Sequence, residues 1–364
     1  MTPTPPGHSA AAVALSGAAV IPGRAERLAS LRLGAISLVV LIHTSVGPAN
    51  PAFAEASEGA RALSAVGYRL ASCLAVPVFL LVAFMGMHPR TGGARTYRKT
   101  LATRCLRLAA PFLFWTAVYG GVKLASGSVA LTPRLLAEYL VLGGAAAHLY
   151  FLPLLAALTA LLPLWLAIAR RPALAVATCL ALPVAASYAV EALRPDDPWR
   201  QAAFGLLGTA CYAVAGLALV ERWRGWEPPA PYRALLAWAA AALALLAAGV
   251  LAGHALEEAR ASAALSPALA ARTARVVFPL ATAVALLASR LRPPAWTVGV
   301  APLAFGVYLV HPFLAKGAVL ATRHVDLLRG SDLLLGPTLG LGVLAASTAL
   351  VLWLMGTPLR RVLA

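Results

Sequence analysis

Charged residues are scarce in this sequence, and acidic ones are scarcer than basic ones. Only 12% of the 364 residues are charged, 13 residues are acidic, and 61% are hydrophobic. Typical soluble domains carry about 25% charged residues. Many apolar runs reach the roughly 20 residues that a helix needs to cross a bilayer. The composition therefore excludes a soluble globular protein and predicts an all-α integral membrane protein.

Cysteine is also rare. The chain has four cysteines, Cys73, Cys105, Cys179 and Cys211, which are scattered through apolar runs without paired or ligand-like spacing. This pattern supports neither a disulfide framework nor a zinc site. We interpret the four residues as packing residues, and we expect no metal in the protein.

The beginning of the chain lacks the basic n-region of a secretory signal peptide. It contains no Lys or Arg before Arg24 and is rich in Pro, Ala and Ser. We therefore expect residues 1–23 to form a disordered cytoplasmic tail. Residues 24–364 are then expected to form one membrane domain.

Ten apolar runs in that domain predict a bundle of about ten transmembrane helices. They lie at about 31–47, 66–87, 106–124, 148–168, 173–191, 202–220, 234–253, 268–289, 296–320 and 334–356. The longest connection, 125–147, contains an apolar piece, Leu135 to Leu142, that is too short to span and is expected to be re-entrant or interfacial. No acidic residue falls clearly inside a span, so the carboxylate relay typical of a proton-coupled transporter is missing.

The net charge of +17 is distributed unequally between the two ends of the predicted spans. The side that holds the N-terminus collects 18 of the 30 basic residues and three acidic ones, a net charge of +15, whereas the other side is net +2. The positive-inside rule therefore places both termini in the cytoplasm. Because the basic residues lie in short loops between apolar runs, we interpret them as contacts to the lipid surface rather than to nucleic acid.

An arginine and a histidine near the start are separated by ten mostly apolar residues. Arg32 and His43 are eleven positions apart, which on a helix returns to within about 20° of the starting direction and rises about 16 Å. One side chain then lies at a membrane surface and the other deep in the bundle. A histidine at that depth usually faces a functional cavity, although a histidine that only donates across a helix interface is the alternative.

Two further arginines lie at the start of the third predicted span, in RKTLATRCLRLAAPFLFW. Arg104 and Arg107 are one helical turn apart and share a face. The planar donors of arginine suit phosphate, so the pair is a candidate site for a nucleotide-like pyrophosphate. Ordinary anchoring of a span by juxtamembrane arginines is the alternative.

Two other segments contain histidine in an aromatic setting. The fourth span opens with HLYFL, where His148 belongs either to a site or to an interfacial aromatic belt. The ninth span contains FGVYLVHP, which places His311 about 22 Å along its helix, close to the depth of about 18 Å expected for His43. Tyr308 lies one turn before His311 and is expected to orient its ring or to contact substrate. The alternative for His311 is a bond to a backbone carbonyl that Pro312 leaves free.

Taken together, these motifs resemble membrane acyltransferase family 3, the ten-span bacterial O-acyltransferases. Arg32 and His43 match the family's R-x10-H signature, Arg104 and Arg107 match its RxxR element, and HLYFL and FGVYLVHP resemble two later segments. The order of the matches is that of the family. One segment departs from the pattern, because VPVFLLVAFMG has Ala83 and Phe84 where the family usually has a small Ser-Gly pair.

The resemblance implies transfer of an acyl group, most simply acetyl, from cytoplasmic acyl-CoA to a hydroxyl of a carbohydrate, cell-envelope or secreted acceptor. It implies that Arg32, Arg104 and Arg107 hold the CoA phosphates and that His43 is a general base or a transient acyl carrier. His311 is a second catalytic candidate, and Tyr308 and His148 are candidates for contact with substrate.

The resemblance also implies a multi-pass protein of a bacterial inner membrane. A transporter or flippase of a lipid-linked sugar or small metabolite remains the rival interpretation, and a noncatalytic relative is a third. Release of CoA from acyl-CoA by the purified protein separates the first two.

Overall fold

The described part of the chain is helical. The computed structural model describes residues 24–44, 57–87, 94–193, 197–223, 230–260, 269–289, 293–322 and 332–363, and within these ranges it contains no strand. This confirms the predicted all-α class. The predicted N-terminal tail, residues 1–23, lies outside the described ranges.

The helices follow the predicted apolar runs, each of which overlaps a helix or an unbroken series of helices. In chain order they are α1 (Arg24–Thr44), α3 (Glu58–Met85), α4 (Ala94–Ala125), α5 (Pro133–Ala137), η2 (Glu138–Leu142), α6 (Phe151–Ala160), α7 (Leu162–Ala169), α8 (Pro172–Leu193), α9 (Pro198–Trp223), α10 (Ala230–Arg260), α11 (Leu269–Ala288), α12 (Trp296–Val300), η3 (Ala301–Leu303), α13 (Ala304–Thr322), α14 (Asp332–Met355) and η5 (Pro358–Val362). The piece predicted to be too short to span, Leu135 to Leu142, lies in the short helices α5 and η2.

Several helices are suited to a membrane. Among the described residues, eight are long and apolar enough to cross one, and the bent pair of α6 and α7 makes a ninth if it is a single span. The helix α1 is not among these eight. Length and composition therefore support a multi-pass membrane protein with eight or nine spans, fewer than the ten predicted.

The fourth predicted span is broken in its middle. The axes of α6 and α7 differ in direction by 66°, and Pro163 lies in the first turn of α7. Because proline has no N–H, the carbonyl of Thr159 loses its usual helical partner. The N–H of Leu161 donates to the carbonyls of Ala157 and Thr159 instead. The break therefore follows from the proline, and its backbone remains hydrogen-bonded.

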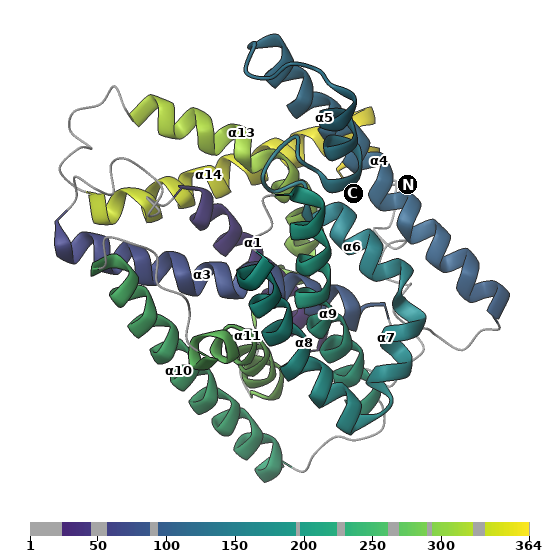
Figure 1. The fold of residues 1–364 in the computed structure, drawn as a ribbon, viewed down its shortest axis with the longest axis vertical. Coiled ribbons are helices and arrows are strands. Elements are labelled where there is room, and N and C mark those ends of the chain that lie inside the picture. The colour runs from purple at the N-terminus through teal and green to yellow at the C-terminus, as the bar shows by residue number, and fades with distance from the viewer. Residues whose placement is uncertain are drawn as a thin grey trace, which may run out of the picture.

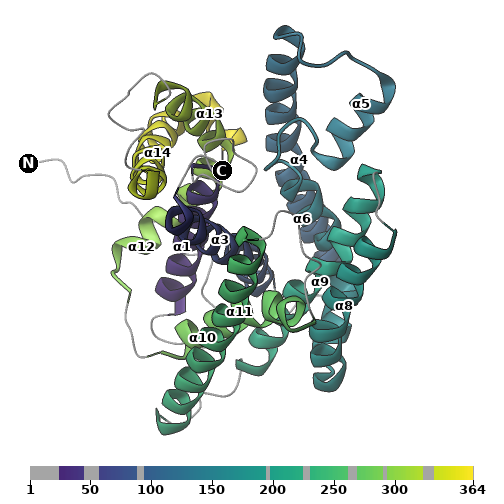
Figure 2. The ribbon, with the colours of Figure 1, turned by 60° about the vertical axis from the view of Figure 1, so that its left-hand side comes forward.

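The helices α1 and α3 lie in the interior of the bundle. α1 packs on α3, α13 and α14, and α3 packs on α9 and α10. Figures 1 and 2 show the purple α1 and blue-violet α3 between the yellow-green pair α13 and α14 and the teal and green helices. This placement brings the end of α1 and the middle of α13 close to the segment before α6.

Large apolar side chains cover the outer faces of the bundle. Trp238 and Leu245 on α10 are 76% and 74% exposed, and Trp353 on α14 is 69% exposed. Side chains of this kind are stable in contact with lipid and costly in contact with water. These faces are consistent with a bundle that is surrounded by a bilayer.

One close helix contact involves the segment that departs from the family pattern. Phe84 on α3 is fully buried, and Gly216 on α9 lies against the same turn. A Cβ atom at Gly216 would lie 2.6 Å from the carbonyl oxygen of Leu81 and 3.2 Å from the Cβ of Phe84. Small residues permit such close approaches between helices in membranes. The absence of a side chain at Gly216 is what lets α9 reach this turn of α3.

Candidate active site

Three histidines that are far apart in the sequence meet in the structure. The ring centroid of His311 on α13 lies 5.1 Å from that of His43 on α1 and 5.7 Å from that of His148, which precedes α6. His148 and His311 are buried, with 4% and 0% exposure, whereas His43 is exposed. His43 is therefore the member of the cluster that an entering molecule reaches first.

The backbone of α13 fixes the tautomer of His311. Its Nδ1 lies 2.9 Å from the carbonyl oxygen of Tyr308 and 3.2 Å from that of Val307. Carbonyl oxygens only accept hydrogen bonds, so Nδ1 carries the proton in the neutral ring. Pro312 has no N–H for the Tyr308 carbonyl four residues earlier, and the His311 ring supplies the missing donor. The alternative predicted from the sequence, a hydrogen bond from His311 to the carbonyl that Pro312 leaves free, is therefore confirmed for Nδ1. It leaves Nε2 unprotonated, buried and without a hydrogen-bond partner among the described residues.

A tight turn holds His148 in the cluster. Gly143 ends η2 with a φ of 76°, and a Cβ atom there would lie 2.7 Å from the backbone of Leu149 and Tyr150. Only glycine combines this conformation with so close an approach. Tyr308 adds a second tie, because its hydroxyl donates to the His148 carbonyl oxygen.

His148 is a neutral residue in this environment. It lies outside the helices that are able to span a membrane. Burial lowers its pKa, and the rings of His311 and His43 and the charge of Lys316 lower it further. Its buried Nε2, like that of His311, has no hydrogen-bond partner in the described part of the chain.

Aromatic rings surround the histidines, and the sequence analysis missed one of them. Tyr119 on α4 lies edge-on to His148 with a centroid distance of 5.0 Å. It stacks on Phe313 at 4.3 Å, and its hydroxyl donates to the Leu309 carbonyl over 3.0 Å. The signal in the sequence is the aromatic spacing of Trp115 and Tyr119, one turn apart on one face of α4.

Arg32 has the properties of an anion ligand. It is half-buried on the same continuous helix as His43, about 16 Å away along the axis. Within the described residues it forms no recorded ion pair or hydrogen bond. Its neighbour Arg27 is instead structural, because it is buried and donates to the Leu287 carbonyl of α11 over 2.8 Å.

Arg104 and Arg107 lie on a different part of the molecule. Both are on the N-terminal half of α4, where Arg104 is half-buried and Arg107 is exposed. The helix α4 packs mainly on α6, η2 and η5, and it runs along the edge of the bundle while α1 lies in the middle (Figure 1). The structure brings His43, His148, Tyr308 and His311 together, and it distributes the three predicted arginines over two helices, Arg32 on α1 and Arg104 and Arg107 on α4.

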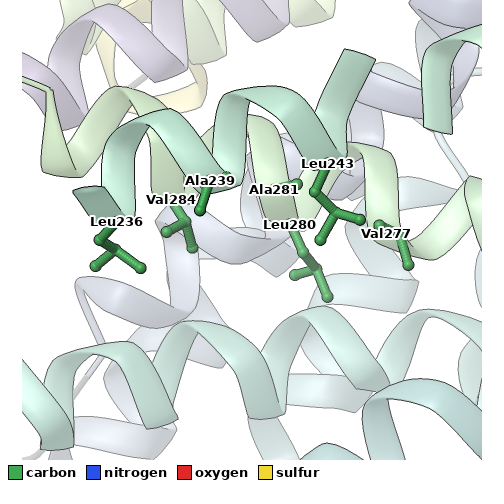
Figure 3. Close-up of a pocket in the computed structure, with 8 residues that line it drawn as sticks. Leu236, Ala239, Leu243, Val277, Leu280, Ala281 and Val284 are labelled. Atoms are coloured by element: carbon green, nitrogen blue, oxygen red, sulfur yellow. The ribbon is translucent and has the colours of Figure 1, made fainter. Parts of the chain in front are cut away.

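Neither a metal site nor the apolar groove of the described ranges competes with the histidine cluster as a site for chemistry. No group of three or more His, Cys, Asp or Glu side chains in the described ranges has the geometry to hold a metal ion. A groove of about 380 Å³ lies between α10 and α11, and Figure 3 shows that its lining is aliphatic. Its residues are Leu236, Ala239, Ala240, Leu243, Val277, Leu280, Ala281 and Val284. The groove has no ionisable or nucleophilic side chain, so the histidine cluster is the candidate for chemistry.

Comparison with known proteins supplies one match. The family model of acyltransferase family 3, described as an acyltransferase domain, matches residues 26–356. No curated protein matches the chain. No solved structure matches it either. The matched range includes all three histidines of the cluster and all three predicted arginines.

Proposed function

Because the chain belongs to acyltransferase family 3, we propose that this membrane acyltransferase moves an acyl group, most simply acetyl, from acyl-CoA to a hydroxyl. We propose a carbohydrate, a cell-envelope component or a secreted small molecule as the acceptor. The observation that carries this proposal is the cluster of three histidines, in which the buried Nε2 atoms of His148 and His311 have no hydrogen-bond partner within the described part of the chain.

In the proposed reaction His43 acts directly on the substrates, because it is the exposed histidine. As a general base, its ring takes the proton of the acceptor hydroxyl while the oxygen attacks the thioester carbonyl. The carbon–sulfur bond breaks, and the CoA thiolate leaves and takes up the proton. As an acyl carrier, the ring nitrogen attacks the thioester carbonyl, the carbon–sulfur bond breaks and the CoA thiolate leaves. The hydroxyl oxygen then attacks the acyl carbonyl on the ring, the carbon–nitrogen bond breaks to regenerate the neutral imidazole, and the hydroxyl proton goes to the CoA thiolate.

His311 is too deeply buried to meet a substrate directly, and we propose that it positions His43. Its Nδ1–H donates to the Tyr308 carbonyl, so its Nε2 is unprotonated and can accept a hydrogen bond. The 5.1 Å separation of the two ring centroids is within reach of a bond from a His43 N–H to this Nε2 after a small rotation. Such a bond would orient the His43 ring and stabilise its protonated form.

The donor end is assigned to the arginines. We propose that Arg32 binds a phosphate of CoA, because it is half-buried on the helix of His43 and has no recorded partner among the described residues. Arg104 and Arg107 are proposed as further phosphate ligands at the start of α4. The acyl arm would then extend along α1 from Arg32 to His43.

The test compares wild type with His43→Ala in detergent. Both are given acetyl-CoA and a membrane and cell-wall extract; free CoA thiol is followed, and mass spectrometry searches for an acceptor heavier by one acetyl group. We expect the substitution to reduce the rate about a hundred- to ten-thousandfold. His254→Asn is the matched control, since His254 is also buried but lies on α10 beside Glu258. A folded wild type that releases no CoA would favour the transporter instead.

The membrane topology is part of the proposal. We propose ten spans in a bacterial inner membrane with both termini in the cytoplasm, which requires that α1 crosses the membrane and that α6 and α7 form one broken span. The unequal charge of the loops supports this orientation. Reporter fusions after each helix test it, and a periplasmic signal at either terminus would contradict it.

A further inference from the structure

Lysine is the rarest basic residue in this chain, and two of the three lysines lie at the histidine cluster. The chain contains Lys99, Lys123 and Lys316 beside 27 arginines. Lys123 is on α4 and Lys316 is on α13, the two helices that contribute the stacked rings of Tyr119 and Phe313. The two lysines are therefore held by the same helix contact that borders His148.

The two lysines have equivalent positions on their helices, relative to the stacked rings of Tyr119 and Phe313. Lys123 follows Tyr119 by four residues and Lys316 follows Phe313 by three, so each lies one turn beyond the stacked pair and on the same face of its helix. The charge of Lys316 acts on both Lys123 and His148. The two ammonium groups thus form a positive rim next to the histidines.

Within the described ranges, neither lysine forms an ion pair with a carboxylate. The contact made there by Lys123 is with the ring of Tyr139, whose centroid lies 5.6 Å from its Nζ. Tyr139 is 5% exposed, and its buried hydroxyl has no hydrogen-bond partner among the residues that the structure describes. Two like charges held close together without a counter-ion repel each other, so an arrangement of this kind favours an anionic ligand.

The rim and Arg32 lie on opposite sides of the histidines. Gly340 on α14 lies against Thr44 and Leu41, whereas Gly306 on α13 lies against Val351, farther along α14. His43, near the end of α1, lies beside His311, and α1 also packs on α12 and η3, which precede α13, so α1 and α13 run in the same direction. Arg32 precedes His43 on α1, and Lys316 follows His311 on α13, so the cluster separates the proposed donor phosphate site from the lysines.

We propose that Lys123 and Lys316 form an anion subsite that binds a carboxylate or phosphate group of the acyl acceptor, next to the hydroxyl that receives the acyl group. The acceptor class is then an anionic carbohydrate or metabolite, such as a uronic acid or a sugar phosphate. This inference rests on the proposed function, since it assigns the substrate of the same site.

Equilibrium binding to the full chain in nanodiscs of zwitterionic lipid provides the test. The probes are methyl glucuronide, glucose 6-phosphate and, as the neutral control, methyl glucoside. We expect wild type to bind the two anions at least tenfold more tightly than the neutral sugar. Lys123→Met with Lys316→Met should lose that preference, since a hydrogen bond to a charged group corresponds to roughly ten- to hundredfold in affinity.

One control changes the third lysine, and the other keeps the positive charge at position 316. Lys99→Met changes the exposed third lysine on the same helix α4 and should keep the wild-type preference, and Lys316→Arg should keep most of it. The double methionine variant is expected to fold, because it removes a repulsion. Lys316→Met alone provides a second variant if it does not.

Three results would overturn the inference. The first is equal or absent binding of charged and neutral probes by wild type. The second is a rise in KM for acetyl-CoA in the lysine variants without loss of anion binding, which would assign the lysines to the donor. The third is an effect seen only when anionic lipid is added to the nanodisc, which would assign them to lipid headgroups. The binding assay involves no turnover. A failed binding test therefore does not contradict the catalytic role of His43, and a failed His43→Ala test does not contradict anion binding by the lysines.

Discussion

Replacing His311 by Asn and by Gln separates the roles of its two ring nitrogens. Nδ1 donates to the Tyr308 carbonyl over 2.9 Å, and the buried Nε2 has no hydrogen-bond partner in the described ranges. The amide of Asn lies near the position of Nδ1, and that of Gln lies near the position of Nε2. The first variant therefore retains the donor to the backbone, and the second retains an acceptor toward His43.

The two variants should change stability and rate in opposite order. His311→Gln leaves the Tyr308 carbonyl without a donor, because Pro312 has no N–H, so it should be less stable than His311→Asn by about 1–3 kcal/mol. His311→Asn leaves nothing at Nε2 and should lower kcat about ten- to hundredfold, the value of one charge-assisted hydrogen bond to the His43 ring. His311→Gln should remain within about fivefold of wild type, because its oxygen still accepts.

Rates of CoA thiol release and thermal unfolding midpoints of the purified variants measure both effects, with His254→Asn as the control. Loss of more than about a thousandfold in both variants would refute the positioning role and make His311 the proton acceptor itself. Rates within about threefold of wild type in both would show that Nε2 has no part in the reaction.

Three further substitutions test the supports of the site. Gly143→Ala forces a Cβ into the backbone before α6 at positive φ; we expect it to displace His148 and lower kcat at least tenfold, measured as CoA release, with a loss of stability of about 1–3 kcal/mol. Tyr119→Phe removes the buried bond to a carbonyl and should lower the free energy of unfolding by about 1 kcal/mol, with an unchanged KM for acetyl-CoA. Gly216→Ala should lower the unfolding midpoint, since its Cβ would meet a backbone oxygen at 2.6 Å, whereas Gly249→Ala, with nothing within 4 Å, should raise it. An equal response of the two glycine variants would contradict the close packing of α3 and α9.

The sequence predicted the helices well, because apolar runs have a length scale that the bilayer sets. It also predicted that His43 and His311 lie at similar depth, which follows from counting residues along two helices. Their actual contact depends on the packing of α1 against α13, which no local pattern encodes. The same holds for Tyr119, whose contact with His148 depends on the packing of α4 against α6.

Some features follow from chemistry that a sequence reader can recognise afterwards. The Y-x-x-H-P order in the ninth span places a free carbonyl at Tyr308 and a donor at His311, so the tautomer follows from Pro312. The break between α6 and α7 follows in the same way from Pro163. Its angle of 66° is set by the surrounding helices and not by the proline alone.

The departure at Ala83 and Phe84 bears on whether this chain is a noncatalytic relative. Phe84 stands where the family usually has a glycine, and it is fully buried in the core that contains Tyr308 and Leu149. On the facing helix, Gly216 has no side chain at the point where α9 meets the Leu81 and Phe84 turn. Gly216 thus lets α9 approach the backbone of α3 at this turn, and the contact is close-packed. Because Phe84 is accommodated in a well-packed core, the altered span is not by itself an argument that the histidine cluster has lost its function.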